Sequence, residues 1–136
     1  METFELLDIL PHFADLLNVQ LREYERMFKA LSDKQRLRIL ALLSRRPLVV
    51  NDIKLMLRLS MPTISQHLSI LRDADLVLDN KQGRWVEYSI HPQLKDPKSF
   101  AGIIYAELKG HFDGDETLNL DFDFLDKLNS RAGNMG

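Results

Sequence analysis

The 136-residue chain contains no cysteine, which excludes a disulfide framework and any metal site built on its own thiolates. Proline and glycine are sparse, with five and six residues, and no apolar run approaches the length of a membrane span. The first residues include the acidic Glu2, Glu5 and Asp8, where a secretory signal peptide would be basic. We therefore expect no membrane association and a cytoplasmic location.

Sequence signatures of catalysis are also missing. The chain has no Gly-rich phosphate loop, no G-x-S-x-G nucleophile turn and no HExxH zinc motif. Its histidines are scattered, at His12, His67, His91 and His111. These absences predict a protein that is not an enzyme, with no catalytic residue and no cofactor.

Charge is distributed unevenly along a chain whose net charge is only −2. Residues 1–25 carry a net charge of −5, residues 26–98 carry +7 and residues 99–136 carry −4. A length of 136 residues suits one domain, so these segments belong to one body. The positive segment favours contact with phosphates, while the acidic flanks are expected to face away from them.

Residues 48–92 have the pattern of a helix, a tight turn, a second helix and a two-stranded hairpin. Asn51 and Asp52 are suited to opening the first helix. The second helix is expected to start after Ser60, whose hydroxyl can accept a hydrogen bond from a free backbone N–H. The pattern places a helix-turn-helix at about 51–74.

The second of these helices has one apolar stripe, since Ile64, Leu68 and Leu71 recur at i, i+4 and i+7. The other faces carry small or neutral hydrogen-bonding residues, namely Thr63, Ser65, Gln66, His67 and Ser69. A helix that meets only solvent would usually carry Glu and Lys there. A helix in the major groove needs short polar groups near base edges, and Gln can pair with adenine through two bonds. The alternative is an ordinary helical hairpin inside a core.

The segment at about 76–91 predicts a wing. Asp79–Gly83 supply turn residues, and Trp85–Ile90 form a return strand of high β-propensity. Lys81 and Arg84 fall at or beside the tip, where long cations reach phosphates or the minor groove. Two solvated loop charges are the alternative interpretation of this pair.

The run Met27–Pro92 resembles the ArsR/SmtB family of bacterial and archaeal winged-helix repressors. The resemblance is carried by ALSDKQRLRILALL at Ala30–Leu43, PTISQHLSILRDADLV at Pro62–Val77 and GRWVEYSI at Gly83–Ile90. It implies a mainly α fold with a small β-wing, a winged helix-turn-helix. It also implies a homodimer that places two recognition helices in successive major grooves of an inverted-repeat operator in double-stranded DNA. Transcription is then blocked until a signal releases the protein.

The resemblance also assigns residues. Carried over position by position, the DNA contacts fall on Thr63, Ser65, Gln66, Ser69 and Arg84. His67 stands where the family usually has His, and we interpret it as structural or phosphate-contacting and not as a metal ligand. Asp75 stands where the family usually has Gly, and Asp tolerates a left-handed helix cap there at modest cost.

Many family members sense soft metals through a Cys-containing stretch that here corresponds to Leu48–Asp52, which offers no thiolate. A second family site lies on the C-terminal helix. Residues 99–112 provide Glu107 and His111 but no matching Asp-x-His, and two ligands are too few for a tight zinc site unless a partner subunit supplies more. We predict no metal site, with an interfacial zinc sensor as the alternative within the family.

The ends of domain 1–112 are predicted to form a dimer. A stripe with spacing of three and four residues runs through Leu6, Leu10, Phe13, Leu17, Tyr24, Met27 and Leu31. A helix at about 99–111 presents Phe100, Ile103, Ile104 and Leu108. The stripe is longer than one small core needs, so a second subunit is expected to cover the remainder.

Residues 113–136 form an acidic and aromatic extension. Asp113, Asp115 and Glu116 lack the spacing of a calcium loop and are interpreted as a solvated acidic turn. The apolar residues of the extension are expected to pin it to the N-terminal helix or to a partner subunit; they are Phe122, Phe124, Leu125 and Leu128.

Two functions of different classes follow. The first is a homodimeric, sequence-specific DNA-binding repressor that is released by a signal other than a thiolate-bound metal, with a small molecule or a protein as effector. The second is a winged helix used as a protein-interaction module through its C-terminal extension. Gln66, its small hydroxyl neighbours and the concentrated positive charge favour the first.

Overall fold

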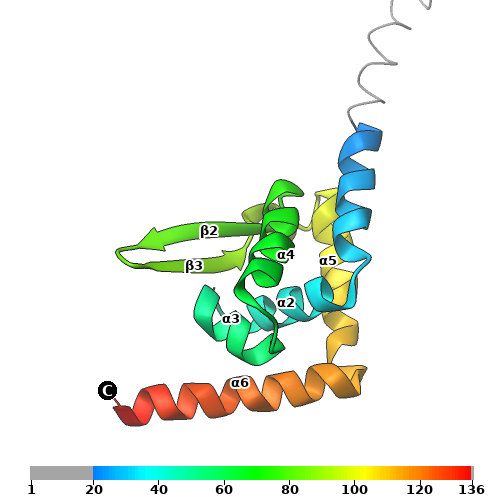
Figure 1. Cartoon of the computed structure of the whole chain (residues 1–136). Helices are drawn as coiled ribbons and strands as arrows, with labels where there is room; N and C mark the ends of the chain where they lie inside the picture. Colours follow the sequence, from blue (N-terminus) through cyan, green and yellow to red (C-terminus); the bar gives the residue numbers. More distant parts are fainter. Residues whose placement is uncertain (1–19, 136) are drawn as a thin grey trace, which may run out of the picture.

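A computed structural model of the chain describes residues 20–135. Residues 20–31 are helical. The further elements are α2 (Lys34–Arg45), β1 (Leu48–Val49), α3 (Val50–Leu57), α4 (Met61–Asp73), β2 (Val77–Gln82), β3 (Trp85–Ile90), the short 3-10 helix η1 (Pro92–Lys95), α5 (Phe100–His111), η2 (Phe112–Gly114) and α6 (Glu116–Met135) (Figure 1). The predicted mainly α fold with a small β-wing is confirmed.

Side-chain caps explain where two of the helices begin. The Asp33 carboxylate accepts hydrogen bonds from the N–H groups of Gln35 and Arg36 at 2.8 and 3.1 Å, which starts α2. The Ser60 hydroxyl accepts one from the N–H of Thr63 at 3.4 Å, as the sequence predicted for α4. Both caps satisfy donors that a helix leaves free in its first turn.

The predicted start of α3 was wrong. Asn51 and Asp52 do not cap the helix; α3 begins at Val50, and its N-cap residue Val49 makes no side-chain cap bond. Val49 is held instead by the sheet, because β1 pairs with β3 in the register Leu48↔Tyr88 and Val49↔Glu87. A strand of two residues is too short to show a periodicity in sequence.

The wing is a three-stranded antiparallel sheet in the order β1-β3-β2. Gln82 pairs with Trp85, so the hairpin turns through Gly83 and Arg84 alone, and Gly83 adopts the left-handed φ of 61° that such a turn requires. The sequence prediction placed the turn at Asp79–Gly83 and was wrong in its length. Beyond Val77 every residue of β2 is exposed, so polar side chains are accommodated in that strand.

The core gathers around α4. Ile64, Leu68 and Leu71 are 0%, 1% and 0% exposed, which confirms the stripe predicted from their spacing. Burial of one such side chain stabilises the fold by about 1.5–3 kcal/mol. The residues of the other elements that are fully buried with them are Ile39, Leu40 and Leu42 of α2, Leu48 of β1, Ile53 of α3, Leu76, Val77 of β2 and Leu125 of α6.

Helix α4 ends in a left-handed turn at Asp75, whose φ is 57°. The Leu76 N–H bonds to the Leu71 carbonyl and the Asp75 N–H to the Arg72 carbonyl, each at 3.0 Å. This pair of bonds is a Schellman motif, which satisfies carbonyls that the helix end leaves free. The predicted left-handed cap at Asp75 is confirmed.

The C-terminal extension contains the long helix α6, which crosses α2 and α3 (Figure 1). Leu118, Phe122 and Leu125 are buried in the core, whereas Phe124 is 39% exposed. The extension was expected to pack on the N-terminal helix or on a partner subunit, and its observed seat on α2 and α3 corrects that expectation. The reason is that the apolar residues of α6 are buried against α2 and α3 of the same chain.

The acidic turn before α6 has a structural role. The Asp115 carboxylate accepts a hydrogen bond from the Leu118 N–H at 2.9 Å and so caps α6. The Asp113 carboxylate lies 2.7 Å from a guanidinium nitrogen of Arg45, which also stacks over the Phe122 ring at 4.1 Å from its centroid. The turn therefore holds the start of α6 to the end of α2.

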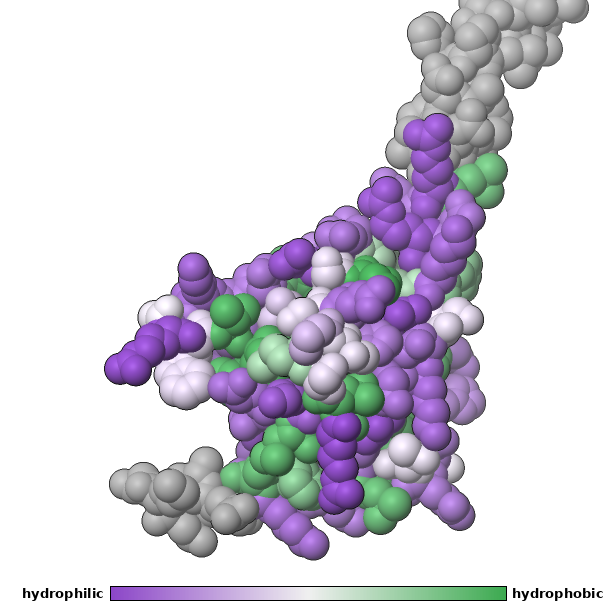
Figure 2. Space-filling view, in the orientation of Figure 1, coloured by the Kyte–Doolittle hydropathy of each residue, from purple (hydrophilic) through white to green (hydrophobic). Residues whose placement is uncertain are grey.

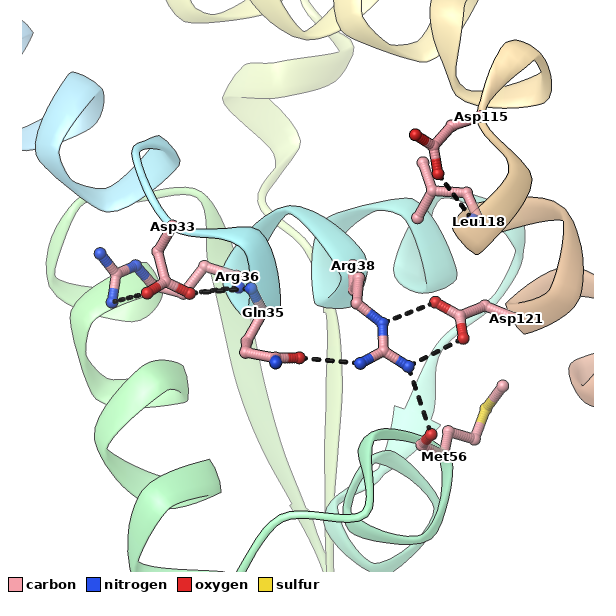
Figure 3. A network of polar contacts seen from close by, with 8 residues as sticks. All are labelled: Asp33, Gln35, Arg36, Arg38, Met56, Asp115, Leu118 and Asp121. Carbon is pink, nitrogen blue, oxygen red and sulfur yellow. Dashed lines mark hydrogen bonds and ion pairs between the residues drawn. The ribbon is translucent and has the colours of Figure 1, made fainter.

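A buried ion pair joins the second turn of α6 to α2 (Figure 3). Asp121 is 7% exposed, and its two carboxylate oxygens accept hydrogen bonds from Nε and Nη2 of Arg38 at 2.8 and 2.9 Å. The remaining Nη1 donates to Gln35 Oε1 at 2.8 Å. The hydrogen bond to Asp121 raises the pKa of Arg38, so the guanidinium is held charged.

Figure 2 shows a mostly hydrophilic face, with apolar side chains grouped where α6 lies against α3. Those two helices carry exposed leucines, Leu55 and Leu120. Among the helices of residues 20–135, none is at once sufficiently long and sufficiently apolar to span a membrane.

We predict that Asp121→Ala lowers the free energy of unfolding by about 3 kcal/mol, because it leaves the buried Arg38 guanidinium without its counter-charge. Urea unfolding followed by circular dichroism measures the change. Asp123→Ala removes an exposed carboxylate from the same helix and is expected to change stability by less than about 0.5 kcal/mol. Equal stabilities of the two variants would contradict the role given to Asp121.

Candidate nucleic-acid interface

Helix α4 presents a polar face to solvent. Ser65 and Gln66 are exposed, while Thr63 and Ser69 are partly buried. The Thr63 hydroxyl lies 2.9 Å from the Ser60 hydroxyl, and the Ser69 hydroxyl accepts a weak bond from Arg72 at 3.5 Å. Ser65 and Gln66 make no side-chain hydrogen bond to another described residue, so their polar groups are free for a ligand.

The structure brings two of the predicted residues together. Ser65 of α4 and Arg84 at the hairpin tip line one hollow of about 290 Å³ between the recognition helix and the wing. The hollow is completed by Val49, Val50, Asn51, Trp85, Val86 and Tyr88. Thr63, Gln66 and Ser69 do not line it.

Three residues at this surface were missed as site residues by the sequence interpretation. Asn51 was taken for a helix cap, and Trp85, which is 56% exposed, for an ordinary strand residue. Arg72 of α4 forms an ion pair with Asp79 of β2 at 3.2 Å and so ties the recognition helix to the wing. The alternation of the hairpin sequence could have indicated the exposure of Trp85, but the ion pair requires the tertiary arrangement.

His67 anchors α4 to the body of the domain. Its Nδ1 lies 3.2 Å from Nη1 of Arg36, and its side chain is mostly buried, with 14% exposed. Because Arg36 can only donate, Nδ1 of His67 accepts and the ring proton sits on Nε2. Arg36 also donates to the Ala30 and Lys29 carbonyls at 2.7 and 3.0 Å. The arrangement is that of a structural histidine.

The Glu107 and His111 pair lies on the surface of α5. The two side chains are 3.2 Å apart, and they are 81% and 78% exposed. No cluster of three or more acidic, histidine or cysteine side chains suited to a metal occurs in the described part of the chain. Within one subunit the pair supplies two ligands.

The fold and this surface define a winged helix-turn-helix protein. The family model of bacterial regulatory proteins of the arsR family matches residues 33–78. The chain is 46% identical over 69 residues to the arsenical resistance operon repressor of Escherichia coli, covering 50% of this chain and 59% of that protein. It is 38% identical over 65 residues to the transcriptional repressor SdpR of Bacillus subtilis, covering 48% of this chain and 72% of SdpR.

Solved structures agree. HlyU from Vibrio cholerae superposes with a TM-score of 0.54 at 28% identity, covering 66% of this chain and 88% of that one. The winged helix-turn-helix domain of Mb0332 from Mycobacterium bovis superposes with a TM-score of 0.60 at 24% identity, covering 75% and 93% of the two chains. The chain belongs to the ArsR family of transcriptional regulators, as the sequence motifs predicted.

The similarity covers only part of the length of these relatives. The chain spans 59% of the Escherichia coli repressor and 66% of the regulator ArsR1 from Pseudomonas putida. These relatives are regulators of transcription, the class of protein that the sequence motifs predicted for this chain.

We predict that Arg36→Lys lowers the free energy of unfolding by about 2 kcal/mol, because an ammonium group cannot replace the three bonds that the guanidinium fork makes. Thermal and urea unfolding measure this loss. Lys34→Ala changes an exposed base of the same helix and serves as the control, with an expected effect below about 0.5 kcal/mol. If Arg36→Lys unfolds like the wild type, the fork does not anchor α4.

Proposed function

We propose that the protein is a cytoplasmic, homodimeric repressor that binds an inverted-repeat operator through α4 and the wing. One observation carries the proposal: Ser65 and Arg84 line a single hollow between the recognition helix and the hairpin, next to an exposed Gln66. Ser65 and Arg84, from two elements that are separate in sequence, thus lie at one hollow, where both can meet the same duplex.

In this arrangement α4 enters the major groove with its uncharged polar side toward the base edges. Gln66 is suited to a bidentate pair with adenine, and the short Ser65 lets the helix approach closely. Arg84 extends from the hairpin turn to a phosphate or the adjacent minor groove. Thr63 and Ser69 are assigned to the edge of the contact, since both are partly buried.

The dimer is proposed to form through helix 20–31 and α5. Tyr24 and Phe28 meet Phe100 with ring centroids 4.6 and 6.1 Å apart, so the two helices share one apolar surface. Its exposed members are Leu21, Phe28, Phe100 and Ile103, at 61%, 48%, 41% and 55%. Mb0332, which has the same fold, is described as homodimeric. Leu6, Leu10, Phe13 and Leu17 of the predicted dimer stripe lie outside the described residues.

Release from the operator is proposed to follow a signal other than a thiolate-bound metal. Relatives from Escherichia coli, Bacillus subtilis and Staphylococcus xylosus are arsenical resistance operon repressors, but this chain has no cysteine with which to bind arsenite. The signal therefore acts through oxygen and nitrogen groups of the chain or through a bound protein.

The operator is first selected from a random pool of duplexes, and we expect an inverted repeat with half-sites about one helical turn apart. Gln66→Ala is predicted to weaken binding of this operator about tenfold or more, because it removes a bidentate base contact. Fluorescence of the sole tryptophan, which lies in the wing at Trp85, reports the binding directly.

Matched variants separate base reading from phosphate contact. Arg84→Ala should weaken all duplexes alike and reduce the slope of log affinity against log salt by about 1. Lys29→Ala, in helix 20–31, should leave affinity unchanged, because that helix stands on the other side of α4 from the wing tip (Figure 1). Affinity that does not respond to salt would support the protein-interaction module instead.

We predict that Ile103→Glu converts the dimer to a monomer, because it places a charge in an apolar interface. Sedimentation equilibrium should then report the 15.8 kDa chain mass in place of twice that value. Leu120→Glu, at a more exposed leucine of α6, is expected to leave the dimer intact. A wild-type chain that is monomeric at high concentration would overturn the proposed assembly.

A further inference from the structure

A second basic surface lies away from the proposed DNA contact. A hollow of about 300 Å³ opens between the end of α2, the end of β3, η1 and α5. Four of its ten lining residues are bases, and none is a carboxylate; the bases are Arg45, Arg46, Lys95 and Lys109. Such a concentration of one charge sign raises the local concentration of anions.

Arg46 is incompletely paired. Its Nε is shielded from solvent and has no hydrogen-bond partner among the described residues. A buried donor left without a partner destabilises the fold, and more so when the group is charged. Arg45 differs, because Asp113 and the ring of Phe122 already hold its guanidinium. A ligand in the hollow cannot reach this shielded Nε, but it can meet the Nη groups of Arg46, which make no hydrogen bond or ion pair with another described residue.

Hydroxyl groups and apolar side chains complete the lining. Ser44, Ser89 and Tyr105 contribute hydroxyls, and burial raises the pKa of Tyr105, so its hydroxyl stays protonated. The apolar part consists of Leu43, Pro47 and Ile90. A ligand with an anionic end and a small apolar body matches this mixture.

The wing's DNA contact does not account for these bases. Ser89 and Ile90, which line the hollow, end β3 at the root of the hairpin, whereas Arg84 precedes its first residue at the tip. At the usual rise of a strand the two ends of β3 are about 17 Å apart. Phosphates held at the tip therefore lie far from Arg46.

We propose that this hollow binds a small organic oxyanion, with its phosphate or carboxylate group on Arg46 and Lys109. A guanidinium fork binds either group through paired hydrogen bonds, and the lysine adds a point charge. The ligand contacts α5 and β3 together, so its binding connects the dimer helix to the wing. This link to operator affinity rests on the proposed function, whereas oxyanion binding itself does not.

Calorimetric titration of the whole chain without DNA tests the site. The probes are phenyl phosphate and benzoate, with sodium chloride at matched ionic strength as the control for general salt effects. We expect saturable heat from one or both organic anions and none from chloride. The probe that binds more tightly shows whether the site prefers a phosphate or a carboxylate group. No saturable heat from either would overturn the proposal.

Variants locate the site. Arg46→Met keeps most of the side-chain volume without donors, and Lys109→Gln changes an exposed residue that the fold does not need. Each is expected to weaken binding of the preferred probe at least tenfold, and Lys127→Ala on α6 should bind as the wild type does. Unchanged affinity in both Arg46→Met and Lys109→Gln would refute the site.

The same variants distinguish this proposal from a contact with DNA. Without added anion, both should bind the selected operator with wild-type affinity and salt slope. A lower affinity with a reduced slope would show that these bases contact phosphates of the duplex, which would overturn the oxyanion site and leave the proposed repressor intact.

Discussion

The burial of one stripe of α4 determines what the rest of the molecule can do. Ile64, Leu68 and Leu71 occupy the centre of the core, so the side of the helix that carries Ser65 and Gln66 must face outward. Only one rotation of the helix about its axis buries such a stripe. Any other rotation would expose these side chains and would lose several kcal/mol of burial free energy, on the order of the values for single buried side chains. The proposed reading surface is thus a consequence of core packing.

Polar contacts then set the position of that helix. The Arg36 fork joins His67 to the end of helix 20–31, and the pair of Arg72 and Asp79 joins α4 to the wing. The first contact lies mostly buried and the second is exposed, with side chains 42% and 40% accessible. Exposed ion pairs contribute little to stability, so the Arg72–Asp79 pair fixes α4 to the wing less firmly than the Arg36 fork fixes it to helix 20–31.

The acidic α6 lies outside residues 33–78, the segment that the family model matches. Its Asp121 neutralises Arg38 inside the fold, and the preceding Asp113 pairs with Arg45 at the surface, so part of the positive charge of α2 is cancelled. Among the bases without a carboxylate partner in the described residues, Arg84 lies at the wing tip, and Arg46, Lys95 and Lys109 line the second hollow. Part of the positive charge counted along the chain is thus paired with carboxylates, and part is left for these two surfaces.

The sequence alone determined the elements that depend on local chemistry. The buried stripe of Ile64, Leu68 and Leu71 and the Ser60 cap follow from helix periodicity and from a short-range hydrogen bond. The family resemblance implied the winged fold and the left-handed cap at Asp75. Only the tertiary structure decided the remaining features. They are the pairing of β1 with β3, the packing of α6 on α2 and α3, the hollow shared by Ser65 and Arg84, and the second hollow, which Arg46 lines. Those features join residues far apart in the chain, and the free energy that selects them comes from packing and charge pairing that no local pattern records.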